Sequence, residues 1–471
     1  MKARMWSWLM LPGLLLLSGC PDGGGGLAPG ALLSSTVVYR ADQDINDVFE
    51  LYRAGSGAKL TPPLSGAQDV TSFAVLPDKS GVVYIADQDS DDVFELYLVR
   101  FAIPGTSTKL NGALAGAQDV DRFVLLPSGS GVVYVADQDT PGIKELYFVS
   151  FSSVGTQARL VPTKHIGGAF DVSPDSTAVV YIADSGSGQN ELFRVPLSGG
   201  APILLSDTLV VGGNVTHFKI AANSTTIVYR ADQTVVQRFE LFYVTTLNPG
   251  ISVTLNGSLV PVPGGDVDTT FAITPNSGAV LYQADETTDG TVELYRATIA
   301  PFPVRSKING VLVGSVSNFA IAPNGAFVIY KADQDIFGVQ ELYRVVLSPL
   351  GTAQKVNPPI AAPKNVESFG IAPDSGAIIY ISDETTAGKH ELHRVLSSVL
   401  GTSTILNGTL RAGGNVTSFG VLSDSSTVFY LADQTTLGTT ELYRVPVTAP
   451  TDSIKSNGLL VVGGNVTGFA F

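Results

Sequence analysis

Short apolar runs alternate with polar turns along almost the whole chain. In one stretch, Ser368 to Ala372 alternates around a phenylalanine, and residues 373–376 read Pro-Asp-Ser-Gly, which has the composition of a tight turn. Further runs at Ala377 to Ile381, Glu391 to Leu396 and Thr402 to Leu406 are separated by polar residues. Short β-branched runs with frequent turn signals predict an all-β unit of four strands and no helix.

This unit repeats through the sequence. The string Tyr-x-Ala-Asp, or Tyr-x-Ser-Asp in one copy, occurs at Tyr39, Tyr84, Tyr134, Tyr181, Tyr229, Tyr282, Tyr330, Tyr380 and Tyr430. Each copy is followed by Glu-Leu and then an aromatic residue, which His393 replaces in the eighth copy. A phenylalanine precedes eight of the tyrosines by 11 residues. Four strands in a repeat of this size are typical of a propeller blade, and once-per-blade aromatic residues are expected to form the core.

The two ends of the repeat region complement each other. The first unit begins at Ser35 and lacks a first strand, whereas Asn465 to Phe471 forms a first strand with no unit after it. Together they would complete one blade and leave no unpaired sheet edge. We therefore predict a β-propeller of nine four-stranded blades over residues 35–471, with eight blades as the alternative count. Phe469 and Phe471 are expected to be buried against the strand around Val37 to Ala41.

The N-terminal residues predict export. Lys2 and Arg4 precede a short apolar run, and Leu17-Ser18-Gly19-Cys20 resembles the lipobox of bacterial lipoproteins. This resemblance implies a signal peptide over residues 1–19 and lipidation of Cys20, the only cysteine in the chain. Residues 20–34 are rich in glycine and would form a flexible tether. We expect the mature protein to be a lipid-anchored monomer of the bacterial cell envelope, at the periplasmic or surface side of the outer membrane rather than at the inner membrane.

Charge excludes one class of partner. Removal of Lys2 and Arg4 with the signal peptide leaves 26 basic against 42 acidic residues, a net charge near −16. Such a surface argues against nucleic acid as a partner and against docking on anionic headgroups. Disulfides cannot contribute to stability because no second cysteine exists.

The repeat also resembles a known family. Ser173-Pro174-Asp175, Val180 to Asp184, Glu191-Leu192-Phe193 and Leu197 to Gly200 are similar to the repeat of TolB-type β-propellers. A related repeat forms the propeller of dipeptidyl-peptidase-like hydrolases. The resemblance implies a propeller scaffold and no active site. Because neither the α/β domain of TolB nor a hydrolase domain accompanies these repeats, it does not imply a role in the Tol–Pal system or peptidase activity.

The sequence contains no common catalytic motif. Gly-x-Ser-x-Gly, His-Glu-x-x-His and the phosphate-binding P-loop are all absent. His390 and His393 resemble a metal-binding pair, but residues three apart on a strand point to opposite faces. We therefore expect no enzyme activity and no catalytic residue or cofactor. A propeller enzyme such as a hydrolase or lyase remains one alternative.

Aspartates after the second strand are the informative polar residues. Their regular recurrence indicates a structural role, because Asp side chains accept N–H groups of a following loop. The loops of units one, two, three and seven continue as Asp-Gln-Asp, and alternating carboxylates on a tight loop also suit Ca²⁺. The possible calcium ligands are Asp42, Asp44, Asp87, Asp89, Asp91, Asp92, Asp137 and Asp139, which we expect to form an acidic arc.

These patterns favour one function over two others. The chain is expected to be a non-catalytic scaffold that binds an envelope protein or glycan through its loops. In each blade, the loop between the second and third strands should lie on the same face of the ring as the connection to the next blade. Gly212 to Val215 and Gly413 to Val416 belong to such connections. A calcium-dependent surface adhesin and a propeller enzyme are the alternatives.

Overall fold

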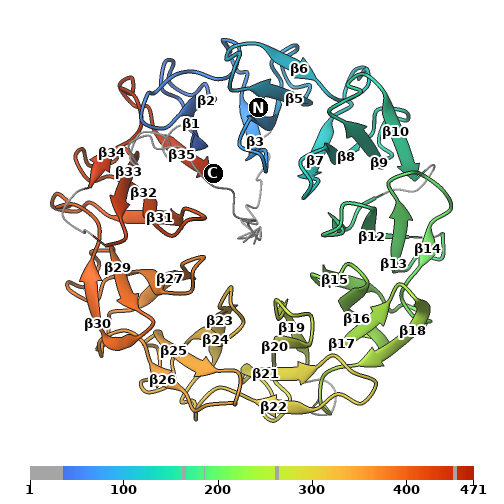
Figure 1. Ribbon diagram of the computed structural model, residues 1–471, viewed down its shortest axis with the longest axis vertical. Coiled ribbons are helices and arrows are strands. Elements are labelled where there is room, and N and C mark those ends of the chain that lie inside the picture. Colours follow the sequence, from blue (N-terminus) through green and yellow to red (C-terminus); the bar gives the residue numbers. More distant parts are fainter. Residues whose placement is uncertain (1–35, 162–165, 185, 260–264, 449–452) are drawn as a thin grey trace, which may run out of the picture.

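The computed structural model describes residues 36–161, 166–184, 186–259, 265–448 and 453–471. Within these ranges the strands form nine antiparallel sheets arranged in a ring, which confirms the predicted nine-bladed propeller (Figure 1). No helix in these ranges is long and apolar enough to cross a membrane. The signal peptide over 1–19, Cys20 and the tether over 20–34 lie outside the described residues.

In the described part of the chain, eight blades contribute one strand to each of four positions, counted from the ring axis outward, and the blade that contains β1 contributes to the first three. The inner strands are β3 (Val70–Val75), β7 (Val120–Leu125), β11 (Phe170–Val172), β15 (Val215–Ile220), β19 (Val267–Ile273), β23 (Val316–Ile321), β27 (Val366–Ile371), β31 (Val416–Val421) and β35 (Val466–Ala470). The second strands are β1 (Val38–Ala41), β4 (Gly81–Ala86), β8 (Gly131–Ala136), β12 (Ala178–Asp184), β16 (Thr226–Val235), β20 (Ala279–Ala284), β24 (Phe327–Ala332), β28 (Ala377–Ser382) and β32 (Thr427–Ala432).

The two outer positions complete the blades. The third strands are β2 (Glu50–Arg53), β5 (Glu95–Arg100), β9 (Glu145–Ser150), β13 (Asn190–Pro196), β17 (Arg238–Thr245), β21 (Glu293–Thr298), β25 (Glu341–Val346), β29 (Glu391–Leu396) and β33 (Glu441–Pro446). The fourth strands are β6 (Ser107–Lys109), β10 (Gln157–Val161), β14 (Ile203–Leu204), β18 (Asn248–Thr254), β22 (Arg305–Lys307), β26 (Gln354–Lys355), β30 (Val399–Ile405) and β34 (Ile454–Lys455). We number the blades from the one that contains β1.

Blade 1 joins the two ends of the described chain. Strand β35 pairs antiparallel with β1, placing Phe469 opposite Tyr39, as the sequence predicts (Figure 1). The described part of this blade forms a three-stranded sheet, and a single bridge between Tyr52 and Lys59 replaces a full fourth strand. The predicted burial of Phe469 and Phe471 is wrong in degree. Both rings are only partly buried, because the inner strand has one side toward the ring axis.

Aromatic pairs form the centre of every blade. The repeat tyrosine on the second strand stands directly opposite the aromatic residue of the third strand, as in the pair Tyr84 and Tyr97. Their ring centroids lie 5.5 Å apart in a stacked arrangement. The same stack occurs in all nine blades, with Phe193 and Phe242 as partners in blades 4 and 5 and His393 in blade 8. Stacked aromatic pairs stabilise a sheet beyond the area that they bury, which confirms the core role of these residues.

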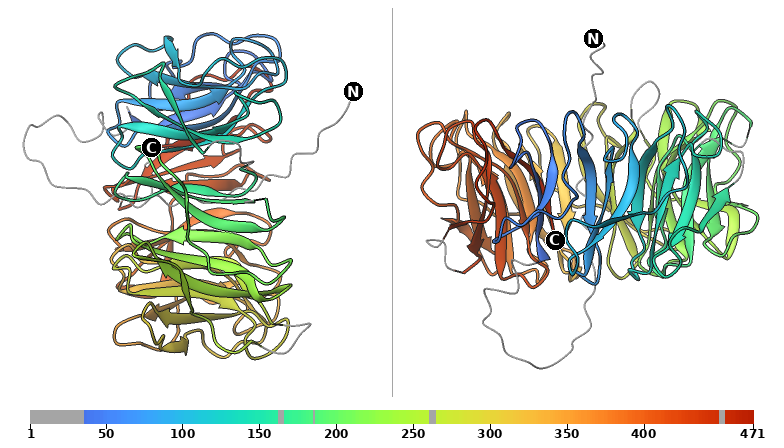
Figure 2. Two further views of the ribbon diagram at one scale, coloured as in Figure 1. Left: turned by 90° about the vertical axis from the view of Figure 1, so that its right-hand side faces the viewer. Right: turned by 90° about the horizontal axis from the view of Figure 1, so that it is seen from above.

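Neighbouring blades share their apolar cores. One cluster joins Ile379 and Leu392 of blade 8 to Val416 and Tyr430 of blade 9, and equivalent clusters follow around the ring. Because each blade runs up and down, its loops alternate between two faces of the disc, which Figure 2 shows edge-on. We call the face with the loops from second to third strand the aspartate face. The opposite face, with the turns from first to second strand and the hairpins from third to fourth strand, is the turn face.

Candidate functional site: the aspartate face

The repeat aspartate closes its own loop. In blade 2, Oδ1 of Asp87 accepts the backbone N–H of Asp69 at 2.6 Å, and Oδ2 accepts the backbone N–H of Asp92 at 3.2 Å. Asp87 is 2% exposed, so these two N–H groups replace water as its hydrogen-bond donors. The carboxylate therefore fixes the loop after β4 against the start of the inner strand β3.

The same arrangement recurs around the ring. The carboxylates that accept one N–H group from their own loop and one from the start of the inner strand are those of Asp42, Asp87, Asp137, Asp232, Asp285, Asp333, Asp383 and Asp433. Asp184 in blade 4 instead accepts the N–H groups of Gly186 and Gly188 from its own loop. These contacts agree with the loop-ordering role that the sequence predicts.

Among the described residues, a second set of hydrogen bonds ties a blade to the preceding one at eight junctions. Oδ1 of Asp69, at the start of blade 2, accepts the backbone N–H of Phe49 in blade 1 at 2.7 Å. The residues in this linking position are Asp69, Asp119, Asn214, Asp266, Ser315, Asn365, Asn415 and Asn465. Asn214 and Asn415 belong to the Gly-Gly-Asn-Val segments, which therefore lie on the aspartate face as predicted.

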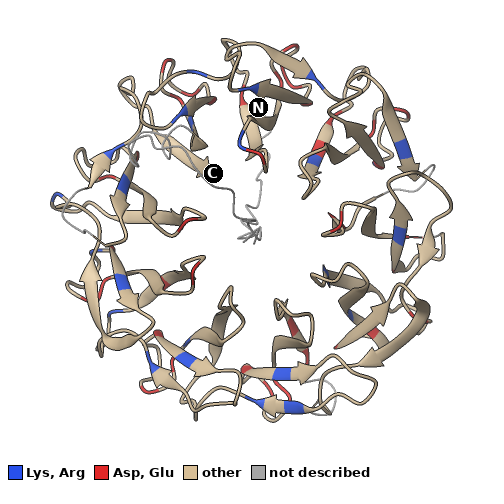
Figure 3. Cartoon of the chain, viewed as in Figure 1, with Lys and Arg blue, Asp and Glu red and all other residues tan. Residues whose placement is uncertain are grey.

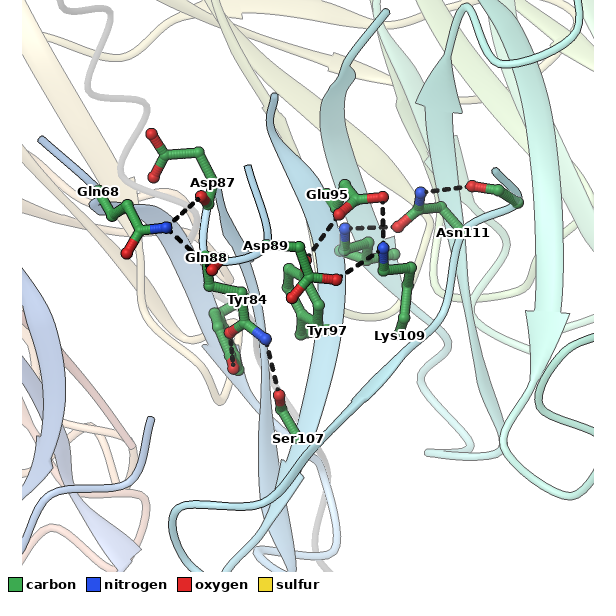
Figure 4. Close-up of polar contacts among 12 residues, drawn as sticks. Gln68, Tyr84, Asp87, Gln88, Asp89, Glu95, Tyr97, Ser107, Lys109 and Asn111 are labelled. Carbon is green, nitrogen blue, oxygen red and sulfur yellow. Dashed lines mark hydrogen bonds and ion pairs between the residues drawn. The ribbon is translucent and has the colours of Figure 1, made fainter. Parts of the chain in front are cut away.

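The second aspartate of each Asp-Gln-Asp loop is paired with a cation. In blade 2, Lys109 Nζ lies 2.8 Å from Oδ2 of Asp89 and 2.7 Å from Oε1 of Glu95 (Figure 4). Tyr97 donates its hydroxyl to Oε2 of the same glutamate at 2.8 Å. Burial raises the pKa of Asp89, but the hydrogen bond and charge of Lys109, together with hydrogen bonds from Tyr97 and Gln88, outweigh it and hold that pKa below its usual range. This ion pair therefore stabilises the loop at neutral pH and is lost as the pH falls through the lowered pKa.

Three other blades contain the same three-residue group. The pairs of second aspartate and cation are Asp44 with Lys59, Asp139 with Arg159 and Asp335 with Lys355, and each cation also reaches the repeat glutamate. Where threonine replaces the second aspartate, as in blade 6, the hydroxyl of Thr287 donates directly to Glu293. Sequence reasoning missed these cations. Their signal was a Lys or Arg 14 residues after the repeat glutamate in blades 2, 3 and 7.

Six of the eight aspartates of the predicted acidic arc have hydrogen-bond or ion-pair partners in the structure. Of its eight aspartates, Asp42, Asp87 and Asp137 bind backbone N–H groups, and Asp44, Asp89 and Asp139 pair with cations. Asp91 and Asp92 have exposed side chains on the loop of blade 2. Within the described ranges, no group of three or more His, Cys, Asp or Glu side chains is arranged to hold a metal ion. Calcium binding by the arc stays a prediction.

The two histidines of blade 8 lie on opposite sides of their strand, as expected. His393 is fully buried, stacks on Tyr380 with centroids 5.2 Å apart, and places Nδ1 3.1 Å from Oε1 of Glu384. Burial raises the pKa of Glu384, but the interaction with His393 outweighs it and lowers that pKa overall. His390 points to the other side, where Nε2 lies 3.8 Å from Oε1 of Glu367.

A pocket opens beside His390 at the aspartate end of blades 8 and 9. It has a volume of about 520 Å³ and is lined by Glu367, Ser368, Ile381, His390, Asn415, Val416 and Thr417. The carboxylate, imidazole, amide and hydroxyl groups make most of this lining polar. No motif in the sequence predicts the pocket, because it arises between two blades.

Two kinds of loop make up the turn face and differ in charge. The turns from first to second strand carry exposed Asp78, Asp175, Asp374 and Asp424, whereas the hairpins from third to fourth strand of blades 1 to 8 are uncharged. The hairpins from third to fourth strand at residues 54–58, 101–106, 151–156, 197–202, 246–247, 299–304, 347–353 and 397–398 contain no charged residue. Several present exposed apolar side chains, namely Ile103, Leu247, Phe302, Val304 and Leu350. Acidic residues lie around the ring mostly in loops (Figure 3). We call the uncharged hairpins from third to fourth strand the apolar rim.

The comparisons with known proteins agree on the fold. A crystal structure described as the eukaryotic initiation factor matches with a TM-score of 0.57 at 12% identity, covering 91% of this chain and 98% of that one. Dipeptidyl peptidase 4 of Porphyromonas gingivalis matches with a TM-score of 0.58 at 11% identity, covering 82% of this chain but only 59% of the peptidase. Identities this low show the propeller fold alone.

Other comparisons add little. A putative TolB from Agrobacterium tumefaciens matches 53% of this chain and 83% of its own length, with 14% identity and a TM-score of 0.33, which is too low to inform the argument. No protein-family model matches the chain, and no curated protein matches it significantly. The chain is a nine-bladed β-propeller whose repeats are linked through aspartate, asparagine and serine side chains.

Proposed function

We propose that this protein is a lipid-anchored, non-catalytic propeller of the bacterial cell envelope that binds a protein or glycan through its aspartate face. The lipobox-like string ending at Cys20 supports the anchor, and the outer membrane is the favoured location. The structural similarity to a peptidase is a similarity of fold, so it does not favour a hydrolase.

The proposed orientation rests on the position of β1, the strand that follows the proposed tether. Strand β1 runs toward Asp42 on the aspartate face, so Thr36, just before it, lies at the turn face. Ala54 donates its backbone N–H to the carbonyl of Val37, as Phe101 does to Ser80 in the turn of blade 2. The glycine-rich composition of residues 20–34 predicts a flexible chain, and a flexible chain of this length spans roughly 20 Å. An anchor at Cys20 therefore holds the turn face toward the membrane.

The apolar rim suits such an orientation. A mature chain with 42 acidic and 26 basic residues would be repelled by an anionic bilayer if its charge faced the lipid. The hairpins of the rim have no charge, and Phe302 at 91% exposure and Leu247 at 82% present apolar side chains in their place. Exposed apolar side chains gain free energy on entering the interface of a bilayer.

The aspartate face then points away from the membrane. Its loops differ from blade to blade, from the acidic tip at Asp91 and Asp92 to the apolar tip at Phe337, which is 79% exposed. Val211, Val311 and Val462 add further exposed apolar side chains in the connections between blades. Exposed apolar groups rimmed by polar residues are typical of protein interaction surfaces.

The anchor has a direct test. Cys20→Ser removes the thiol that would receive the diacylglycerol, so we expect complete loss of acylation and an uncleaved signal peptide. Metabolic labelling with a clickable fatty acid, followed by gel fluorescence, measures the acylation. Ser18→Ala, which keeps a small residue in the lipobox, serves as the control and should label normally. Equal labelling of Cys20→Ser and wild type would show that the anchor is elsewhere.

A further inference from the structure

Neighbouring blades meet in an equivalent groove at the aspartate face, and in some blades a cationic side chain fills it. Between blades 5 and 6 the filling residue is Arg230, which directly follows the repeat tyrosine. Its Nε donates to the carbonyl oxygen of Val267 at 2.6 Å, and its Nη1 donates to Oγ1 of Thr216 at 3.0 Å. The guanidinium carbon lies 3.8 Å from the centroid of the Phe239 ring.

Residues at the same repeat position fill the next two grooves. Gln283 Nε2 donates to the carbonyl of Val316 at 2.8 Å between blades 6 and 7. Lys331 Nζ donates to the carbonyl of Glu367 at 2.8 Å between blades 7 and 8. In all three grooves a nitrogen donor thus reaches a backbone carbonyl on the next blade's inner strand.

The groove between blades 8 and 9 lacks this side chain. Ile381 occupies the repeat position here and has no nitrogen donor, like Ile85, Val135, Ile182 and Leu431 at the same position of other blades. Beside Ile381 lies the pocket of about 520 Å³ described above. The comparable pocket beside Arg230 has about 250 Å³. By the strand register, Val416 of the open groove corresponds to Val267, because each pairs with the alanine before the repeat aspartate of its blade.

The other groups around the open groove match the chemistry of the missing cation. His390 takes the position of Phe239, directly before the repeat glutamate. Its imidazole ring lines the open groove, whereas in the groove between blades 5 and 6 the Phe239 ring packs against the guanidinium of Arg230. Glu367 takes the position of Thr216 and replaces a hydroxyl with a carboxylate. A planar ring, a carboxylate and a backbone carbonyl are together the partners that a guanidinium prefers.

We infer that the pocket between blades 8 and 9 binds a guanidinium group of a ligand, which occupies the place that Arg230 fills within blade 5. The guanidinium stacks on His390, pairs with the carboxylate of Glu367 and donates to the carbonyl of Val416. The ligand is an arginine side chain of a peptide or a free small guanidine. This inference goes beyond the proposed function and holds whether or not Cys20 carries lipid.

Calorimetry on the purified full-length protein tests the inference with defined probes. N-acetyl-arginine amide and the peptide acetyl-Gly-Arg-Gly-amide represent a peptide arginine, agmatine represents a small guanidine, and the neutral citrulline peptide is the negative probe. We expect binding of the guanidinium probes but not of citrulline. Tighter binding of the peptide would identify a peptide source, and tighter binding of agmatine a small-molecule source.

Variants of the pocket residues test whether the guanidinium probes bind between blades 8 and 9. Glu367→Gln removes the charge partner and should weaken binding by about tenfold or more. Ile381→Arg supplies the internal guanidinium found in blade 5 and should abolish binding. The control is Asp121→Asn, which changes the carboxylate at the equivalent position of blade 3 and should leave binding unchanged. If Ile381→Arg fails to fold, His390→Ala takes its place and should also weaken binding.

Three results would overturn the inference. These are binding of citrulline as tight as that of arginine, binding by Glu367→Gln equal to wild type, and no heat with any guanidinium probe at about 10 mM. None of them bears on the anchor or on the orientation of the ring, which are measured separately.

Discussion

Deleting residues 465–471 is expected to destabilise the whole ring by several kcal/mol. The deletion removes β35, the inner strand of blade 1, and with it the pairing of Phe469 with Tyr39. It also removes Asn465, whose N–H bonds to Asp42 and whose side chain accepts the N–H of Thr440 in blade 9. The deletion therefore removes one hydrogen bond within blade 1 and one across the junction of blades 9 and 1.

The size of the effect follows from burial. Truncating a fully buried phenylalanine to alanine costs about 3–5 kcal/mol, and a half-buried ring contributes less. Phe469 and Phe471 pack against each other and against Phe429 of blade 9, so we expect the two rings to account for about 3 kcal/mol and the lost strand pairing for more. The deletion also exposes an edge of β1, which favours association of chains.

Denaturant unfolding and size-exclusion chromatography measure both effects. The control is the double variant Leu459→Ser and Val462→Ser, which changes the same terminal segment at side chains that are 88% and 101% exposed. This control should unfold like wild type. A deletion variant that unfolds at the wild-type denaturant concentration and elutes as a monomer would contradict closure through β35.

Asp87→Ala is expected to cost about 3 kcal/mol of unfolding free energy. The carboxylate accepts the N–H groups of Asp69 and Asp92, and hydrogen bonds to charged groups contribute about 1.5–3 kcal/mol each when a buried partner is left unsatisfied. We expect the same loss in buffers with and without Ca²⁺, because the stabilising contacts are to backbone groups. Urea unfolding monitored by fluorescence measures the change.

A neighbouring carboxylate provides the matched control. Asp89 is in the same loop, but its side chain is 48% exposed and its partner Lys109 is 37% exposed. Exposed ion pairs contribute little, so Asp89→Ala should change the unfolding free energy by less than about 1 kcal/mol. If Asp87→Ala destabilised the protein only in the presence of Ca²⁺, the loop-ordering role would be wrong and calcium binding would be its main role.

The repeat made the fold predictable from the sequence. Equivalents of Tyr84, Asp87 and Glu95 occur at nearly fixed spacing in nine copies. Residues that recur once per blade pack within and between blades, so their spacing predicts the blade. The terminal segment around Phe469 revealed closure, because it is a first strand without a following unit. Its degree of burial could not be predicted, since exposure toward the ring axis depends on the width of the ring.

The site was less predictable because it depends on contacts between strands. Lys109 lies on the outer strand of its blade and meets Asp89 only after two strands have folded back. The pocket beside His390 lies between two blades, next to Ile381 rather than next to a nitrogen donor such as Arg230, and no local motif in the sequence marks it. Comparing the same position across blades, after the register is known, reveals both features.

Photocrosslinking in living cells tests the central claim that the aspartate face binds the partner while the turn face lies toward the membrane. Two phenylalanines form a matched pair. Phe337 is 79% exposed on the loop from β24 to β25, and Phe302 is 91% exposed on the hairpin from β21 to β22. Each is replaced by a photoreactive phenylalanine analogue, and the products are identified by mass spectrometry. We predict protein or glycan products from position 337 and lipid products from position 302. Lipid products from position 337, with protein products only from position 302, would contradict the account.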